Sequence, residues 1–128
     1  LQEQCVVVNA AARGQQTDIA FGGGHEAAIK QSGVNATASG NTQIVALVPG
    51  KKIRVLWALV GNSGAAVVDV NFQSAAAAIT ATMPLAVDGG FMANPQPAWL
   101  CETLIGEALN INLSAIGAVA VTLGYIEV

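Results

Sequence analysis

The chain has 128 residues, a length that is typical of one domain. A chain of this length can bury a hydrophobic core without disulfides or a structural metal. Charged residues make up only 10% of it and the net charge is −3, whereas an ordinary soluble domain has roughly 25% charged residues. Five Lys and Arg residues are too few for the basic stripe that nucleic acids or anionic membranes require. No apolar run reaches the ~18 residues of a transmembrane helix. We therefore expect neither direct nucleic-acid binding nor membrane attachment.

The low charge also predicts how the protein assembles. Hydrophobic residues make up 53% of the chain, so much of the surface must be apolar or merely polar. Such a surface is tolerated when other subunits cover it. We expect an obligate oligomer or a component of a lattice. The alternative is a monomer rich in Ala and Gly, whose hydrophobic count is inflated by alanine.

Residues 1–39 are irregular and predict an N-terminal arm. Cys5–Asn9 and Thr17–Phe21 each have the pattern of a short strand, and Gly22–Gly24 reads as a flexible joint. The small and polar segment Gln31–Asn41 reads as a linker or loop. An arm of this kind often gains its order by packing on a neighbour.

Residues 40–128 predict a compact domain whose first part is a meander of three strands, Thr42–Gln73. Pro49-Gly50 supplies a type II turn after the first strand. The second strand, Ile53–Val60, is apolar on both faces, so we expect it inside the sandwich or at a subunit contact. Strict alternation assigns its side chains to two faces: Ile53, Val55, Trp57 and Leu59 on one, and Arg54, Leu56, Ala58 and Val60 on the other.

The remaining chain continues with short strands and turns. Its alanine-rich segment Ser74–Ala81 fits either a helical turn or an extended chain. A loop is expected at Phe91–Pro97, because two prolines so close together exclude a central strand. The expected strands are Pro84–Val87, Trp99–Leu104, Leu109–Ser114 and Val119–Val128. About eight antiparallel strands without an amphipathic helix predict an all-β fold, a single β-sandwich or jelly-roll-like domain.

The sequence contains one candidate for acid–base chemistry. His25 is the only histidine, and Glu26 and Asp18 lie near it in the sequence. A hydrolase would still need a nucleophile, and no Gly-x-Ser-x-Gly elbow is present. We interpret His25 as a loop residue and expect no enzymatic activity, with a small hydrolase as the alternative. Two cysteines and one histidine also lack the ligands of a structural zinc site, and we expect no cofactor.

Three aromatic residues are candidates for contacts with other subunits or a capsid, because aromatic side chains are enriched at interfaces. They are Trp57, Phe91 and Trp99. Core packing is the alternative for each of them. Cys5 and Cys101 both lie in apolar runs and read as small core residues, with a disulfide between them as the alternative.

The domain at about residues 40–128 resembles a known family. Its runs Gly40–Leu56, Gly106–Ala115 and Gly124–Val128 are similar, in this order, to segments of small virion structural proteins of tailed bacteriophages. The resemblance implies a compact β-sandwich that decorates the head or forms part of the tail, often as a trimer or other ring, without catalysis.

The resemblance also implies partners and a location. A decoration, or cement, protein binds the major capsid protein and copies of itself on the capsid surface of the virion, and passes through the host cytoplasm during assembly. The alternative role is a tail or fibre component whose β-sandwich binds a receptor or glycan. A cellular lectin or adhesion module is a further alternative.

Overall fold

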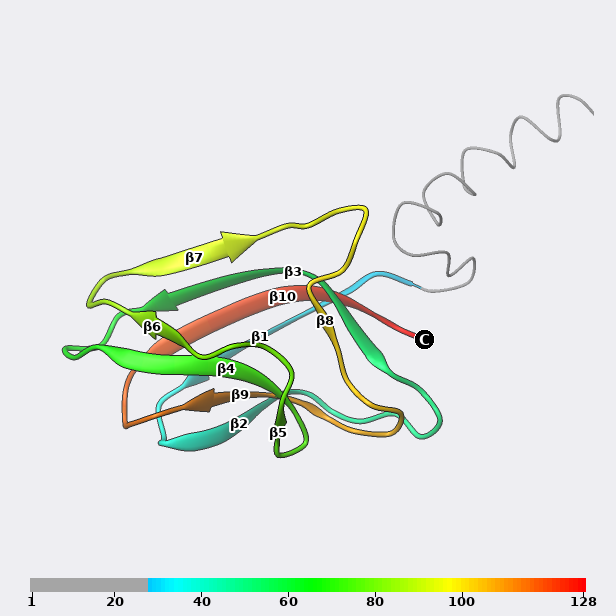
Figure 1. The fold of residues 1–128 in the computed structure, drawn as a ribbon, viewed down its shortest axis with the longest axis horizontal. Helices are drawn as coiled ribbons and strands as arrows, with labels where there is room; N and C mark the ends of the chain where they lie inside the picture. The colour runs from blue at the N-terminus through cyan, green and yellow to red at the C-terminus, as the bar shows by residue number, and fades with distance from the viewer. Residues whose placement is uncertain (1–27) are drawn as a thin grey trace, which may run out of the picture.

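The computed structural model describes residues 28–128, which form a sandwich of two five-stranded antiparallel sheets (Figure 1). No helix occurs among these residues. The expectation of an all-β sandwich is therefore confirmed, with ten strands in place of about eight. Sheet A contains β1 (Lys30–Ala36), β10 (Val119–Glu127), β3 (Ile53–Asn62) and β7 (Gly90–Ala93) in this order, with β8 (Cys101–Glu102) also paired to β3; sheet B contains β2 (Gly40–Val45), β9 (Leu109–Leu113), β4 (Val68–Ser74) and β5 (Ala77–Ala78), with β6 (Met83–Leu85) also paired to β4.

The core lies between the two sheets and follows from their period-2 patterns. In sheet B, β9 and β4 bury every second side chain, of which Phe72 and Ile111 are at most 1% exposed. In sheet A, β10 contributes alternate residues such as Leu123 and Tyr125. Burying this apolar surface stabilises the fold by about 25 cal/mol per Å² before the entropy of folding is subtracted.

The strand β1 corrects the expectation of a linker at Gln31–Asn41. It pairs along its length with β10 as an edge strand of sheet A, and the Ser32 hydroxyl donates a hydrogen bond to the Ile44 carbonyl of sheet B at 2.7 Å. Small polar residues suggested a loop, but an edge strand needs only alternate inward positions, here Ser32, Val34 and Ala36. The sandwich therefore extends into the range 1–39 that was assigned to the arm.

Two other segments differ from the expectations. The predicted loop Phe91–Pro97 begins as a strand, because β7 ends at Ala93, before the prolines, and lies at the edge of sheet A. The predicted strand Trp99–Leu104 is regular only at β8. The alanine-rich segment makes a tight hairpin into β5, with φ of 51° at Ala75.

The turn at Pro49-Gly50 has the expected geometry. Gly50 has φ of 76°, and the Lys51 amide donates to the Val48 carbonyl at 3.1 Å. Only glycine takes this backbone region without strain, so the residue types account for the turn.

A register shift separates the two halves of the long β3–β10 ladder, which runs along the molecule in Figure 1. Val55 pairs with Tyr125 and Trp57 pairs with Gly124, which leaves Leu56 as an extra residue of β3. An extra residue reverses the alternation of side chains beyond it. The predicted faces of β3 are therefore wrong from Trp57 onward: Ile53 and Val55 point into the core, whereas Trp57 and Leu59 lie on the outer face of sheet A.

The absence of a side chain at Gly124 makes room for Trp57. A Cβ atom at position 124 would overlap the Trp57 indole nitrogen, so the indole lies directly over the glycine backbone. This contact covers Gly124 and leaves Trp57 half-buried.

We predict that Gly124→Ala lowers the free energy of unfolding by about 1–3 kcal/mol, because the indole must move away from a crowded site. Chemical denaturation measures the change. Gly61→Ala is the matched control, since a Cβ atom there meets nothing within 4 Å. Adding Trp57→Ala to Gly124→Ala should cost less than the two single changes together. Strict additivity would contradict the packing described.

Candidate functional site

The outer face of sheet A presents exposed apolar side chains on β3 and on the edge strand β7. Leu59 of β3 and Met92 of β7 pair directly across the strands and are 45% and 70% exposed. Trp57 lies two residues from Leu59 on the same face. We call Trp57, Leu59 and Met92 the apolar patch.

Small and uncharged residues surround the apolar patch. Thr122 pairs with Leu59 on its other side, and Ala120 pairs with Gly61. On β1 the outward positions are Gln31, Gly33 and Asn35. Among the outward residues of these strands, only Arg54 and its β8 partner Glu102 are charged. The face is thus uncharged over most of its area and apolar at β3 and β7, as a surface that packs on another protein would be.

Arg54 and Glu102 form an ordered cluster at one end of this face. The Arg54 Nε atom donates to Glu102 Oε2 at 2.7 Å, and Lys52 Nζ lies 3.3 Å from Glu102 Oε1. The Arg54 guanidinium stacks 3.9 Å from the centre of the Trp99 ring, a cation–π contact. Trp99 remains 42% exposed, so the cluster holds an aromatic ring at the surface.

The pKa of Glu102 reflects two opposed effects. Burial raises the pKa of this carboxyl, but the hydrogen bonds and charges of Arg54 and Lys52 outweigh burial and bring the pKa below its usual value. The carboxylate is therefore ionised at neutral pH and fixes the guanidinium beneath Trp99.

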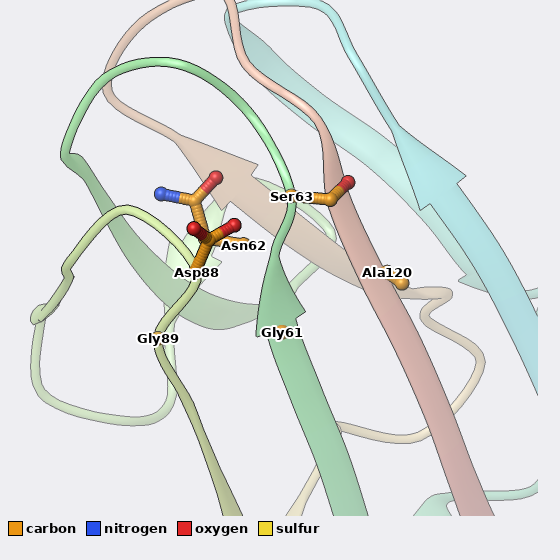
Figure 2. Close-up of a pocket in the computed structure, with 6 residues that line it drawn as sticks. All are labelled: Gly61, Asn62, Ser63, Asp88, Gly89 and Ala120. Carbon is orange, nitrogen blue, oxygen red and sulfur yellow. The ribbon is translucent and has the colours of Figure 1, made fainter.

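A surface depression lies at the opposite end of β3 (Figure 2). Its volume is about 320 Å³, and its lining residues are Gly61, Asn62, Ser63, Asp88, Gly89 and Ala120. The Asn62 amide is not available to a ligand, because its Nδ2 atom donates to the carbonyls of Ala66, Leu85 and Ala86 and its Oδ1 atom accepts from the Gly64 amide. The Ser63 hydroxyl donates to the Ala118 carbonyl at 3.2 Å.

These bonds give the depression a structural role. Asn62 is 3% exposed and ties the end of β3 to the two neighbouring loops. Asp88 is the one charged residue of the lining, and a single carboxylate without a base or nucleophile beside it is no catalytic arrangement. Nor does the part of the chain from residue 28 onward contain a group of three His, Cys, Asp or Glu side chains that could hold a metal ion.

The structure places the three predicted contact residues differently. Trp57 and Trp99 lie at the outer face of sheet A, half-buried and exposed respectively. Phe91 pairs with Val60 and packs against the core, because β7 turns every second side chain inward. Its neighbour Met92, which sequence reasoning missed, is the exposed residue; the pairing of β7 with β3 was not visible in the loop-like sequence.

The other predicted sites are less fully described. Asp18, His25, Glu26 and Cys5 lie outside the described residues, so the hydrolase alternative and the disulfide stay predictions. Cys101 is 7% exposed in the core, and burial raises the pKa of its thiol to about 12. Residues 28–128 include no helix long and apolar enough to cross a membrane.

Exposed apolar residues also occur in the loops at both ends of the sandwich. Leu47, Leu104 and Ile105 lie in two loops that are joined by a hydrogen bond from the Gly106 amide to the Lys51 carbonyl at 2.8 Å. Val67 and Ile116 are exposed in loops toward the other end. Single exposed apolar residues are common on protein surfaces, so they define no site by themselves.

Comparisons with known proteins add one distant structural likeness. No protein-family model matches the chain, and no curated protein matches it. Among solved structures, a chain described as "Cyanophage Pam1 capsid asymmetric unit" aligns with 80% of this chain and 87% of its own, at 17% sequence identity and a TM-score of 0.41. A likeness at this level does not assign the chain to a family.

We predict that the contribution of Glu102 to stability depends on pH. Because its pKa is lower in the folded chain, the contribution is present above the usual glutamate pKa and is lost as pH falls through the lowered value. Glu102→Gln should reduce the free energy of unfolding by about 1 kcal/mol or less at pH 7 and less at pH 3. Asp88→Asn, which removes a carboxylate without an ion pair among the described residues, is the control. An equal loss at both pH values would contradict the ion pair's role.

Proposed function

We propose that this chain is a structural protein of a bacteriophage virion, and more closely a capsid decoration (cement) protein that stabilises the head by binding the major capsid protein. The observation that carries this proposal is the mostly uncharged outer face of sheet A with the apolar patch on β3 and the edge strand β7. The resemblance of residues 40–128 to small virion proteins of tailed phages supports it. The role is structural and not enzymatic.

The apolar patch suits a contact that forms without a strong electrostatic attraction. Leu59 and Met92 together present exposed apolar surface, and methionine adapts to an irregular partner. Burial of such surface contributes about 25 cal/mol per Å² before the cost of association. A partner that displays many identical sites, such as a capsid shell, can be covered by many copies of so small a domain.

Self-association is part of the same proposal. Trimers or other rings of the chain would cover further apolar surface at the end of the sandwich where Leu104 and Ile105 are exposed. Copies that contact both one another and the shell bind with higher avidity than either contact alone provides.

A tail or fibre component that binds a receptor or glycan is the second candidate. The observation that favours it is Trp99, whose ring is held at the surface by Arg54 and remains 42% exposed. An ordered, exposed aromatic ring can stack on a ligand. On this reading the chain is present in few copies and only on tails.

The proposal predicts where the chain occurs in purified particles of the phage that encodes it. Quantitative mass spectrometry should find it in a fixed ratio to the major capsid protein, in complete virions and in heads without tails alike. Detection on tails alone would overturn the decoration role and favour the second candidate.

Binding to the shell should depend on the apolar patch. We predict that the double change Leu59→Ser and Met92→Ser lowers the amount of protein bound to undecorated heads at least tenfold, because both side chains lose their apolar contact. Sedimentation of heads with added protein measures this. Ile116→Ser, which removes a side chain that is 81% exposed at one end of the sandwich, is the control and should bind normally. Normal binding by the double variant would contradict the assignment of this face.

A further inference from the structure

The outer face of sheet B is as distinctive as that of sheet A, but it is polar. Six carboxamide side chains occupy its centre in two rows that cross three neighbouring strands, β2, β9 and β4. The strand registers place Asn41, Asn112 and Asn71 in one row, and Gln43, Asn110 and Gln73 in the other. Asn is disfavoured in strands, so this composition is not explained by strand formation.

Internal hydrogen bonds hold much of this amide surface in place. Asn112 Nδ2 donates to Asn41 Oδ1 at 2.8 Å, and Asn110 Nδ2 donates to the Ala75 carbonyl at 2.7 Å. Asn71 Nδ2 donates to the Thr82 hydroxyl at 3.1 Å. Asn41 Nδ2 also donates to the Ala75 carbonyl, at 3.2 Å. These bonds use an amide N–H group of each of the four asparagines and orient their side chains on the sheet.

The same bonds leave hydrogen-bonding capacity on the face. No hydrogen bond within residues 28–128 engages the carboxamides of Gln43, which is exposed, and Gln73, which is half-buried, whereas Asn71 Oδ1 lacks a hydrogen-bond partner but is itself buried. A carboxamide oxygen accepts two hydrogen bonds and its nitrogen donates two. The face therefore offers closely spaced acceptors and donors that the fold does not consume.

We propose that this amide face is a binding surface for neutral, polyhydroxylated ligands, that is, for glycans. A sugar hydroxyl both donates and accepts hydrogen bonds, as a carboxamide does, so the two surfaces are complementary. Neighbouring strands lie about 4.8 Å apart, so each row offers three polar groups at short regular intervals, and adjacent hydroxyl groups can engage them together.

The charge of the face favours a neutral glycan over other partners. None of the six central residues is charged, and Asp69, at the margin on β4, is the nearest charge along that strand. Without Lys or Arg the face has no attraction for phosphate, sulfate or acidic sugars. None of the six central residues is apolar, so they give no driving force for an apolar protein partner.

The same chemistry predicts weak binding by one copy. Hydrogen bonds that replace bonds to water give a small net gain, and no aromatic ring lies among the six residues to add stacking. Repetition of the face over many copies would raise the overall avidity. The glycan site itself does not depend on the virion role, so either proposal can fail alone.

Nuclear magnetic resonance titration of the isotope-labelled full chain tests the site. The probes are neutral oligosaccharides of three kinds, namely oligomers of glucose, of mannose and of N-acetylglucosamine. We expect at least one of them to shift the side-chain amide signals of the two rows and the backbone signals of β2, β9 and β4. A failure of all three to shift these signals would overturn the proposal, as would shifts centred on Trp57 or Trp99.

A pair of variants separates binding from folding. Gln43→Ala together with Gln73→Ala removes two carboxamides for which no hydrogen bond occurs within residues 28–128, so the fold should persist. We expect the dissociation constant to rise at least tenfold. Asn94→Ala, in the loop after β7, removes an exposed carboxamide elsewhere and should leave binding unchanged. Unchanged glycan binding by the Gln43→Ala and Gln73→Ala double variant would overturn the proposal. The proposal would also be overturned if the chain binds no glycan and the double variant has a lower oligomer mass than the unchanged chain, because the face would then contact a second copy of the chain.

Discussion

The register shift between β3 and β10 is the constraint on which the surface of this protein depends. The two strands are the long central pair of sheet A, and the extra residue Leu56 divides them into halves with opposite alternation. Before the shift, Ile53 and Val55 complete the core. After it, Trp57 and Leu59 lie outside and Ala58 and Val60 lie inside. Without the shift, two large apolar side chains would face the core and the apolar patch would not exist.

The two outer faces of the sandwich are consequently unlike each other, although both are nearly free of charge. Sheet A presents an apolar patch with the Arg54–Glu102–Trp99 cluster at one end, and sheet B presents two rows of carboxamides. A domain with an apolar side and a polar, hydrogen-bonding side can attach by one and remain hydrated on the other. The proposed decoration role uses the apolar side, and the proposed glycan site uses the polar side.

Sequence patterns predicted most of the fold because alternation is a local property. The strand predicted at Leu109–Ser114 is β9, which ends one residue earlier, at Leu113, and the Pro49-Gly50 turn followed from two residue types. The wrong predictions concern segments whose structure depends on pairing with another strand. The edge strands β1 and β7 have weak local signals and exist because β10 and β3 lie beside them. No glycine or proline lies beside Leu56 on β3, so the sequence did not indicate the register shift.

The candidate surfaces were less predictable than the strands. Trp57 and Trp99 were predicted as contact residues from their aromatic character, and the structure places both at the surface of sheet A. Met92 was missed because it lay in an expected loop. The amide face was missed because its six members come from three strands, and only the cross-strand registers bring them into rows.

In the proposed decoration role, the outer face of sheet A attaches this domain to a capsid shell. Photo-cross-linking in assembled particles tests it most directly, with a photoreactive residue placed at position 92 in one variant and at position 43 in another. We predict a covalent adduct with the major capsid protein from position 92 and none from position 43. An adduct from position 43 alone, or from neither position in particles that contain the chain, would contradict it.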